Sequence, residues 1–88
     1  MTYHMLATGK VQGVGFRNMT EGIAKILKLK GTVQNLENGQ VEIFVNADEK
    51  ALESLKAHLF AGNLHSRLDS LECEIIEDKN FENFIVLR

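Results

Sequence analysis

The chain has 88 residues, of which 44% are apolar, so it can form one continuous core and we expect a single domain over residues 1–88. Its formal net charge of −2 argues against a nucleic-acid partner, because such affinity needs a marked excess of Lys and Arg. The single cysteine, Cys73, excludes an internal disulfide and a cysteine zinc cluster, which fits a reducing, cytoplasmic compartment. No stretch has the pattern of a signal peptide or a membrane span, so we expect no membrane partner.

The first third of the chain predicts a strand, a glycine loop and a helix. Residues 3–11 are rich in β-branched and apolar residues, and they run into a tight loop at residues 12–15. Apolar residues then recur at steps of three or four, which places them on one face of a helix: Phe16, Met19, Ile23, Ile26 and Leu27. We expect Gly31 to end this helix.

A hairpin follows this helix. Apolar residues occur in residues 32–36, and a second run in residues 41–47 alternates apolar with polar side chains. Asn38 and Gly39 lie between the two runs. Because both residues tolerate a positive φ, this pair is a strong hairpin signal.

The second half of the chain predicts another helix and two strands. Asp48 is a candidate N-cap, with Asn46 as the alternative, for a helix whose apolar face consists of Ala51, Leu52, Leu55 and Leu59. We expect Gly62 to end this helix and residues 63–69 to form a polar loop. Three apolar residues then alternate with glutamates, as in a half-exposed strand: Leu71, Cys73 and Ile75. Residues 84–87 predict a short final strand.

The predicted order is β-α-β-β-α-β with one short extra strand. It indicates an α+β fold of the ferredoxin-like, split β-α-β type, a sandwich with two helices packed on one face of a mainly antiparallel sheet. Strands that are joined through a helix point the same way. The loop after Val11 and the end of the second strand near Asn35 should therefore meet at one end of the sheet.

Residues 9–17 carry the clearest sign of chemistry. Three glycines within residues 9–15 let backbone N–H groups turn inward, and the loop leads into a helix N-terminus, which favours an anion. Arg17 lies in the first helical turn, where helix electrostatics favours an acid, and a bound phosphate would explain it through bidentate pairing. The alternative is a tight turn with a solvated Arg17. The glycine spacing matches neither the dinucleotide fingerprint nor a P-loop, which disfavours nucleotide binding.

Two motifs together resemble the acylphosphatase family, whose members hydrolyse carboxyl–phosphate anhydrides. The first is Gly-x-Val-Gln-Gly-Val-Gly-Phe-Arg at residues 9–17, and the second is Gly-x-Val-x-Asn-x-x-x-Gly-x-Val-Glu at residues 31–42. The resemblance extends over nearly the whole chain. It departs from the family at Ala7, Thr32 and Ala47, where a larger aliphatic residue, an aromatic residue and a glycine are usual, and none of these positions carries a reacting group.

The resemblance implies that the chain is a hydrolase, an acylphosphatase that converts an acyl phosphate to a carboxylate and inorganic phosphate without a metal or other cofactor. It implies two catalytic residues: Arg17 binds the substrate phosphate and Asn35 positions the attacking water. The phosphate-binding residues that it implies are Gln12, Gly13, Val14, Gly15, Phe16 and Arg17. The expected partners are a small-molecule acyl phosphate, and inorganic phosphate or sulfate as product or mimic. We expect the chain to act as a cytoplasmic monomer.

The residue types are compatible with this chemistry. A carboxylate leaving group needs little help from a general acid, so positioning and electrostatics suffice. Phosphoryl transfer has a loose transition state with charge on the non-bridging oxygens, where Arg17 and the loop amides would hold it. The alternative is a non-enzymatic module that binds a phosphorylated metabolite or carbamoyl phosphate, as similar domains do in hydrogenase-maturation carbamoyltransferases. Phosphate binding without turnover would distinguish this alternative from the enzyme.

Overall fold

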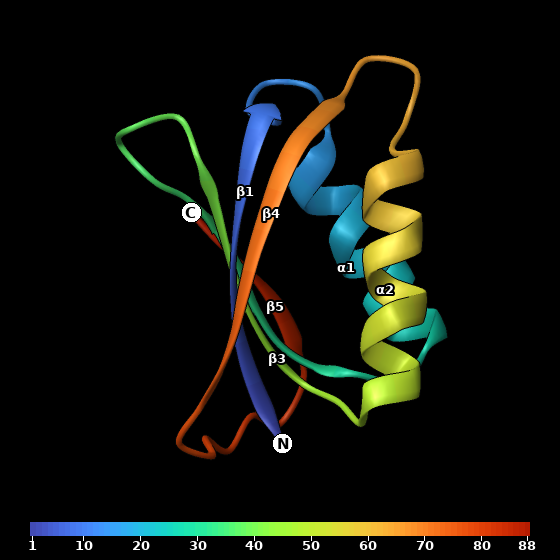
Figure 1. Cartoon of the computed structure of the whole chain (residues 1–88). Coiled ribbons are helices and arrows are strands. Elements are labelled where there is room, and N and C mark those ends of the chain that lie inside the picture. The colour runs from blue at the N-terminus through green and yellow to red at the C-terminus, as the bar shows by residue number, and fades with distance from the viewer.

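The computed structural model describes residues 1–88 as five strands and two helices in two layers (Figure 1). The elements are β1 (Thr2–Lys10), α1 (Phe16–Ile26), β2 (Lys30–Asn35), β3 (Val41–Asn46), α2 (Glu49–Ala61), β4 (Arg67–Ile76) and β5 (Phe84–Leu87). One sheet has the strand order β4-β1-β3-β2-β5, and both helices cover the same face of it. Only the pairing of β2 with β5 is parallel. The predicted ferredoxin-like α+β sandwich is confirmed.

The core lies between the helices and the sheet. Successive side chains of a strand point to opposite faces, so alternate residues of β1 and β3 enter the core. The main buried residues are Tyr3, Met5, Ala7, Val41, Ile43 and Val45 from these strands, Phe16 and Ala24 from α1, and Leu52, Leu55 and Leu59 from α2. No helix covers the other face of the sheet (Figure 1), where His4 Nε2 and Glu42 Oε2 lie 2.8 Å apart. Neither helix has the length and apolar character that crossing a membrane requires.

The first helix ends earlier than predicted. It stops at Ile26 with Leu27 as its C-cap, and Lys28 adopts the left-handed conformation with a φ of 60°. Gly31, which was expected to end the helix, lies inside β2, where a Cβ would collide with the carbonyl oxygen of Phe44 on β3. The close approach of two strands requires this glycine, so the prediction that it caps the helix was wrong.

Most other boundaries agree with the predictions. Asp48 caps α2 by accepting a hydrogen bond from the backbone N–H of Ala51 at 2.8 Å, and Gly62 ends this helix with a φ of 66°. The hairpin between β2 and β3 contains the predicted Asn-Gly pair, but its loop spans residues 36–40 and only Gly39 has a positive φ. The predicted loop of residues 63–69 is shorter than expected because β4 begins at Arg67, which pairs with Lys10.

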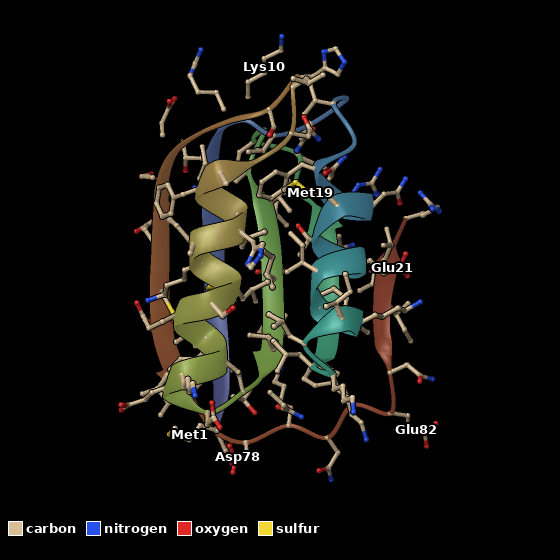
Figure 2. All side chains as sticks on the ribbon, turned by 90° about the vertical axis from the view of Figure 1, so that its right-hand side faces the viewer. Met1, Lys10, Met19, Glu21, Asp78 and Glu82 are labelled. Atoms are coloured by element: carbon tan, nitrogen blue, oxygen red, sulfur yellow. The ribbon has the colours of Figure 1, made fainter.

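The register brings the predicted site segments to one end of the sheet. Val41 of β3 pairs with Ala7 of β1 on one side and with Asn35 of β2 on the other. The β1–α1 loop, the β2–β3 hairpin and the α2–β4 loop all lie toward this end, at the top of Figure 1. Figure 2 shows Lys10 at this end and Met1 at the opposite one. The prediction that the loop after Val11 and the end of β2 share one end of the sheet is confirmed.

Candidate active site

The glycine loop between β1 and α1 forms one wall of a small hollow of about 150 Å³. Seven residues line it: Val11, Gly13, Gly15, Phe16, Arg17, Asn18 and Arg88. Gly13 and Gly15 have φ values of 72° and 78°, a left-handed conformation that residues with a side chain rarely adopt. This conformation winds the loop tightly before α1 begins at Phe16.

Backbone N–H groups without partners gather at this loop. The amides of residues 12–15 donate no hydrogen bond within the chain. The first helical bond runs from Met19 N–H to the carbonyl oxygen of Gly15 at 3.0 Å, and no side chain caps the helix. The first turn of α1 contains no acidic residue. Free amides together with the positive end of the helix dipole make this loop suited to an oxyanion.

Arg17 brings a positive charge to the same hollow. Its Nη1 donates a hydrogen bond to the carbonyl oxygen of Leu87 on β5 at 3.1 Å. None of the ion pairs in the structure involves Arg17. A guanidinium has five N–H donors, so one bond to Leu87 leaves the others available to an anion. Arg88 adds a second cation at the rim.

Asn35 lies at the same end of the sheet, although it is not among the residues that line the hollow. Its side-chain oxygen Oδ1 is buried and accepts no hydrogen bond from the protein. Leaving a buried amide oxygen unpaired costs roughly 1–3 kcal/mol, so native structures almost always satisfy such atoms. Oδ1 of Asn35 is therefore available to accept a hydrogen bond from water or from a ligand.

Gln12 ties the glycine loop to the hairpin beside Asn35. Its Nε2 donates to the carbonyl oxygens of Leu36 and Gln40 at 2.8 and 2.9 Å. Its side chain thus contacts the hairpin and does not line the hollow. The sequence prediction places Gln12 in the phosphate cradle, and the structure adds a bracing contact that the motif alone did not indicate.

A second brace comes from Asn63, which belongs to neither of the two sequence motifs. Its Nδ2 donates a hydrogen bond to the carbonyl oxygen of Val14 at 2.9 Å, across 49 positions of sequence. The contact places the α2–β4 loop directly against the glycine loop. An amide residue just after the helix-ending Gly62 was the only sign of it in the sequence, and such residues are common in loops of any kind.

A known protein family matches most of the chain. The family model described as acylphosphatase matches residues 3–86. The chain belongs to the acylphosphatase family. Acylphosphatases hydrolyse acyl phosphates, so the chain is a hydrolase with a small-molecule substrate, and the predicted family and enzyme class are confirmed.

Individual acylphosphatases resemble the chain over most of its length. An acylphosphatase of Borrelia garinii subsp. bavariensis is 43% identical, over 88% of this chain and 87% of that protein. The crystal structure of acylphosphatase from Bacillus subtilis has a TM-score of 0.92 and 30% identity, and the match covers 99% of this chain and 98% of that one. Full-length HypF, solved in a phosphate- and nucleotide-bound form, contains a similar unit with a TM-score of 0.83 and 27% identity; the match covers 99% of this chain and 12% of HypF.

Proposed function

We propose that residues 1–88 act as one acylphosphatase domain in which residues 12–16 and Arg17 hold the substrate phosphate and Asn35 orients the attacking water. The observation that carries this proposal is the buried, unpaired Oδ1 of Asn35, which lies at the end of the sheet where Arg17 and the free loop amides gather. These groups supply an anion site and a water acceptor from separate elements.

The phosphate site acts through electrostatics. In the loose transition state charge is spread over the non-bridging phosphate oxygens, and fixed N–H donors stabilise it without having to reorganise. The amides of residues 12–15 and the free donors of Arg17 are such groups. Because the chain itself provides this positive charge, the proposed mechanism uses no metal or other cofactor.

Asn35 accepts a hydrogen bond from the water through Oδ1, which turns a lone pair of the water oxygen toward phosphorus. The water oxygen forms a bond to phosphorus while the bond between phosphorus and the carboxyl oxygen breaks, and the carboxylate leaves with the electron pair. Neither Asn35 nor the permanently protonated Arg17 can take the proton that the water loses. A phosphate oxygen receives it, and the products are a carboxylate and inorganic phosphate.

The remaining proposals concern the oligomeric state of the enzyme, its compartment and the anions that compete with substrate. We infer that the enzyme acts as a monomer in the cytoplasm and that inorganic phosphate or sulfate competes with substrate for the loop and Arg17. The glycine loop and Arg17 line the same hollow, which supports competition between phosphate and substrate for a single anion site.

Hydrolysis of benzoyl phosphate in ¹⁸O-labelled water tests the mechanism. With a chelator present, we expect undiminished turnover, competitive inhibition by phosphate, and the label in the inorganic phosphate. Label in the benzoate would show attack at the carbonyl carbon and contradict the role of Asn35. Loss of turnover in the chelator would contradict the metal-free mechanism.

The same experiment distinguishes the enzyme from a non-enzymatic module that only binds phosphate. A module that only binds phosphate would show saturable phosphate binding in the folded protein and no hydrolysis of benzoyl phosphate. That result would favour the binding module over the enzyme.

A further inference from the structure

We infer that Asn63 is a positioning residue that fixes the direction of the Gly15 amide in the phosphate loop. The inference rests on the proposed function of that loop. Its starting point is the hydrogen bond of 2.9 Å from Asn63 Nδ2 to the carbonyl oxygen of Val14. This bond holds the peptide unit that joins Val14 to Gly15.

Because a peptide unit is planar, a bond that fixes the carbonyl of Val14 also fixes the direction of the Gly15 N–H group. In a trans peptide the C=O and N–H groups point in opposite directions, and every peptide bond of the chain is trans. Asn63 donates to the carbonyl of Val14 but does not line the hollow. Gly15 does line the hollow. The N–H of Gly15 donates no bond within the chain. The brace therefore directs a free donor away from Asn63 and toward the anion site.

The peptide unit needs this hold because of the glycines beside it. Gly13 and Gly15 both adopt the left-handed conformation, and no Cβ restricts rotation about their backbone bonds. Rotation of the Val14–Gly15 peptide plane would point a carbonyl oxygen, instead of an N–H group, at the phosphate. A single hydrogen bond from outside the loop opposes this rotation.

Asn63 is itself held rigidly. Its Oδ1 accepts hydrogen bonds from the backbone N–H groups of His65 and Ser66, both at 2.8 Å. Its own backbone N–H donates to Ser66 Oγ at 2.9 Å. With Oδ1 satisfied by two donors, the amide group can present only Nδ2 to Val14. The bonds that shape the α2–β4 loop and the bond that reaches the glycine loop use different atoms, so mutations can separate the two roles.

The test compares Asn63→Ser with Ser66→Ala. A serine hydroxyl can still accept from the amides of the loop, but it is too short to reach the carbonyl of Val14. Ser66→Ala removes a bond within the α2–β4 loop and leaves Nδ2 of Asn63 in place. For each variant, inorganic phosphate is titrated while the ¹⁵N–¹H signal of the Gly15 amide is followed, and kcat and KM are measured with benzoyl phosphate.

We expect Asn63→Ser to raise the dissociation constant of phosphate about fivefold to tenfold, the scale of one hydrogen bond, and to reduce the shift of the Gly15 signal at saturation. The value of kcat/KM should fall by at least the same factor, because the donor also faces the transition state. Ser66→Ala should leave phosphate affinity within about twofold of the wild type, a change of less than half a hydrogen bond.

Three outcomes would overturn either the positioning role of Asn63 or the proposed phosphate loop. If both variants weaken phosphate binding equally, Asn63 acts only through loop stability and the inference is wrong. If the wild-type Gly15 signal responds to phosphate and Asn63→Ser binds phosphate as well as the wild type, the inference alone fails. If the wild-type signal does not respond at all, the proposed phosphate loop fails first. Should Asn63→Ser not fold, Asn63→Thr retains the loop acceptor and gives the same comparison.

Discussion

The Nη1 atom of Arg17 and the carbonyl oxygen of Leu87 lie 3.1 Å apart, although 70 positions separate these residues in the sequence. The bond ties the first turn of α1 to the edge strand β5. One donor of the guanidinium therefore anchors the side chain while its other donors remain at the hollow. A planar fork can serve both purposes at once, whereas the ammonium group of a lysine is a compact point charge.

Arg17→Lys should accordingly weaken phosphate binding although the charge is kept. We expect the dissociation constant of phosphate to rise about tenfold to a hundredfold, because hydrogen bonds to a charged group are lost. Calorimetric titration with phosphate measures this change. Lys10→Gln is the matched control: it removes an exposed cation of the same motif that does not line the hollow, and should leave the affinity unchanged. Wild-type affinity in Arg17→Lys would show that charge alone suffices.

Gln12→Ala should destabilise the fold. It removes two hydrogen bonds to the carbonyl oxygens of Leu36 and Gln40, and we expect the free energy of unfolding to fall by about 1–3 kcal/mol. Urea denaturation monitored by circular dichroism measures the loss. Asn38→Ala removes only contacts within the exposed hairpin tip and should cost less. Equal urea midpoints for Gln12→Ala and the wild type would mean that the brace contributes nothing to stability.

Two glycine substitutions should change stability in opposite directions. In Gly31→Ala the new Cβ would collide with the carbonyl oxygen of Phe44, so the strands must separate and we expect a loss of at least about 2 kcal/mol. A Cβ at Gly22, inside α1, meets nothing within 4 Å, and alanine favours a helix, so Gly22→Ala should add about 0.5–1 kcal/mol. Thermal unfolding compares the two variants. A stable Gly31→Ala protein would contradict the close pairing of β2 with β3.

The thiol of Cys73 should titrate above its usual range. Burial raises the pKa of this thiol; Lys56 opposes the shift, and Glu53 and Glu74 reinforce it. The unfolded chain then loses the thiol proton first as the pH rises above the ordinary value of 9.0, so the free energy of unfolding falls in that range and is unaffected below it.

The pH dependence of iodoacetamide alkylation measures this titration. We expect a higher midpoint in the native protein than in urea. In Cys73→Ala the corresponding loss of stability at alkaline pH should disappear. A native midpoint at or below the midpoint in urea would contradict the shift.

Periodicity and turn residues predicted most of the fold because local and tertiary preferences agree along this chain. The apolar steps of α1 and the alternation in residues 41–47 identified their elements, and the order of elements then placed the loop after Val11 near Asn35. Gly31 was misassigned because a glycine after a helical pattern can mark either a helix end or a close approach of strands. Only the pairing with Phe44 separates the two cases.

The site was predictable in part for the same reason. Arg17 and the glycine loop form a contiguous motif, so they are visible in the sequence. The contacts of Asn63 with Val14 and of Leu87 with Arg17 join segments that lie far apart in the sequence. They depend on how loops and an edge strand pack, which no local pattern encodes. The residues proposed to act on the substrate could thus be named from the sequence, whereas the contacts that brace them could not.

The proposed roles of Arg17 and Asn35 are tested by a comparison of Asn35→Ala with Gln34→Ala. Gln34 is the neighbour of Asn35 in β2, and its side chain lies on the opposite face of the sheet. For both variants, kcat with benzoyl phosphate and the inhibition constant of phosphate are determined. We expect kcat of Asn35→Ala to fall about a hundredfold or more while the inhibition constant stays within about twofold, because the proposed mechanism gives Asn35 the water and not the phosphate. Gln34→Ala should resemble the wild type. A parallel rise of the inhibition constant in Asn35→Ala, or an undiminished kcat, would contradict the proposed division of labour between Arg17 and Asn35.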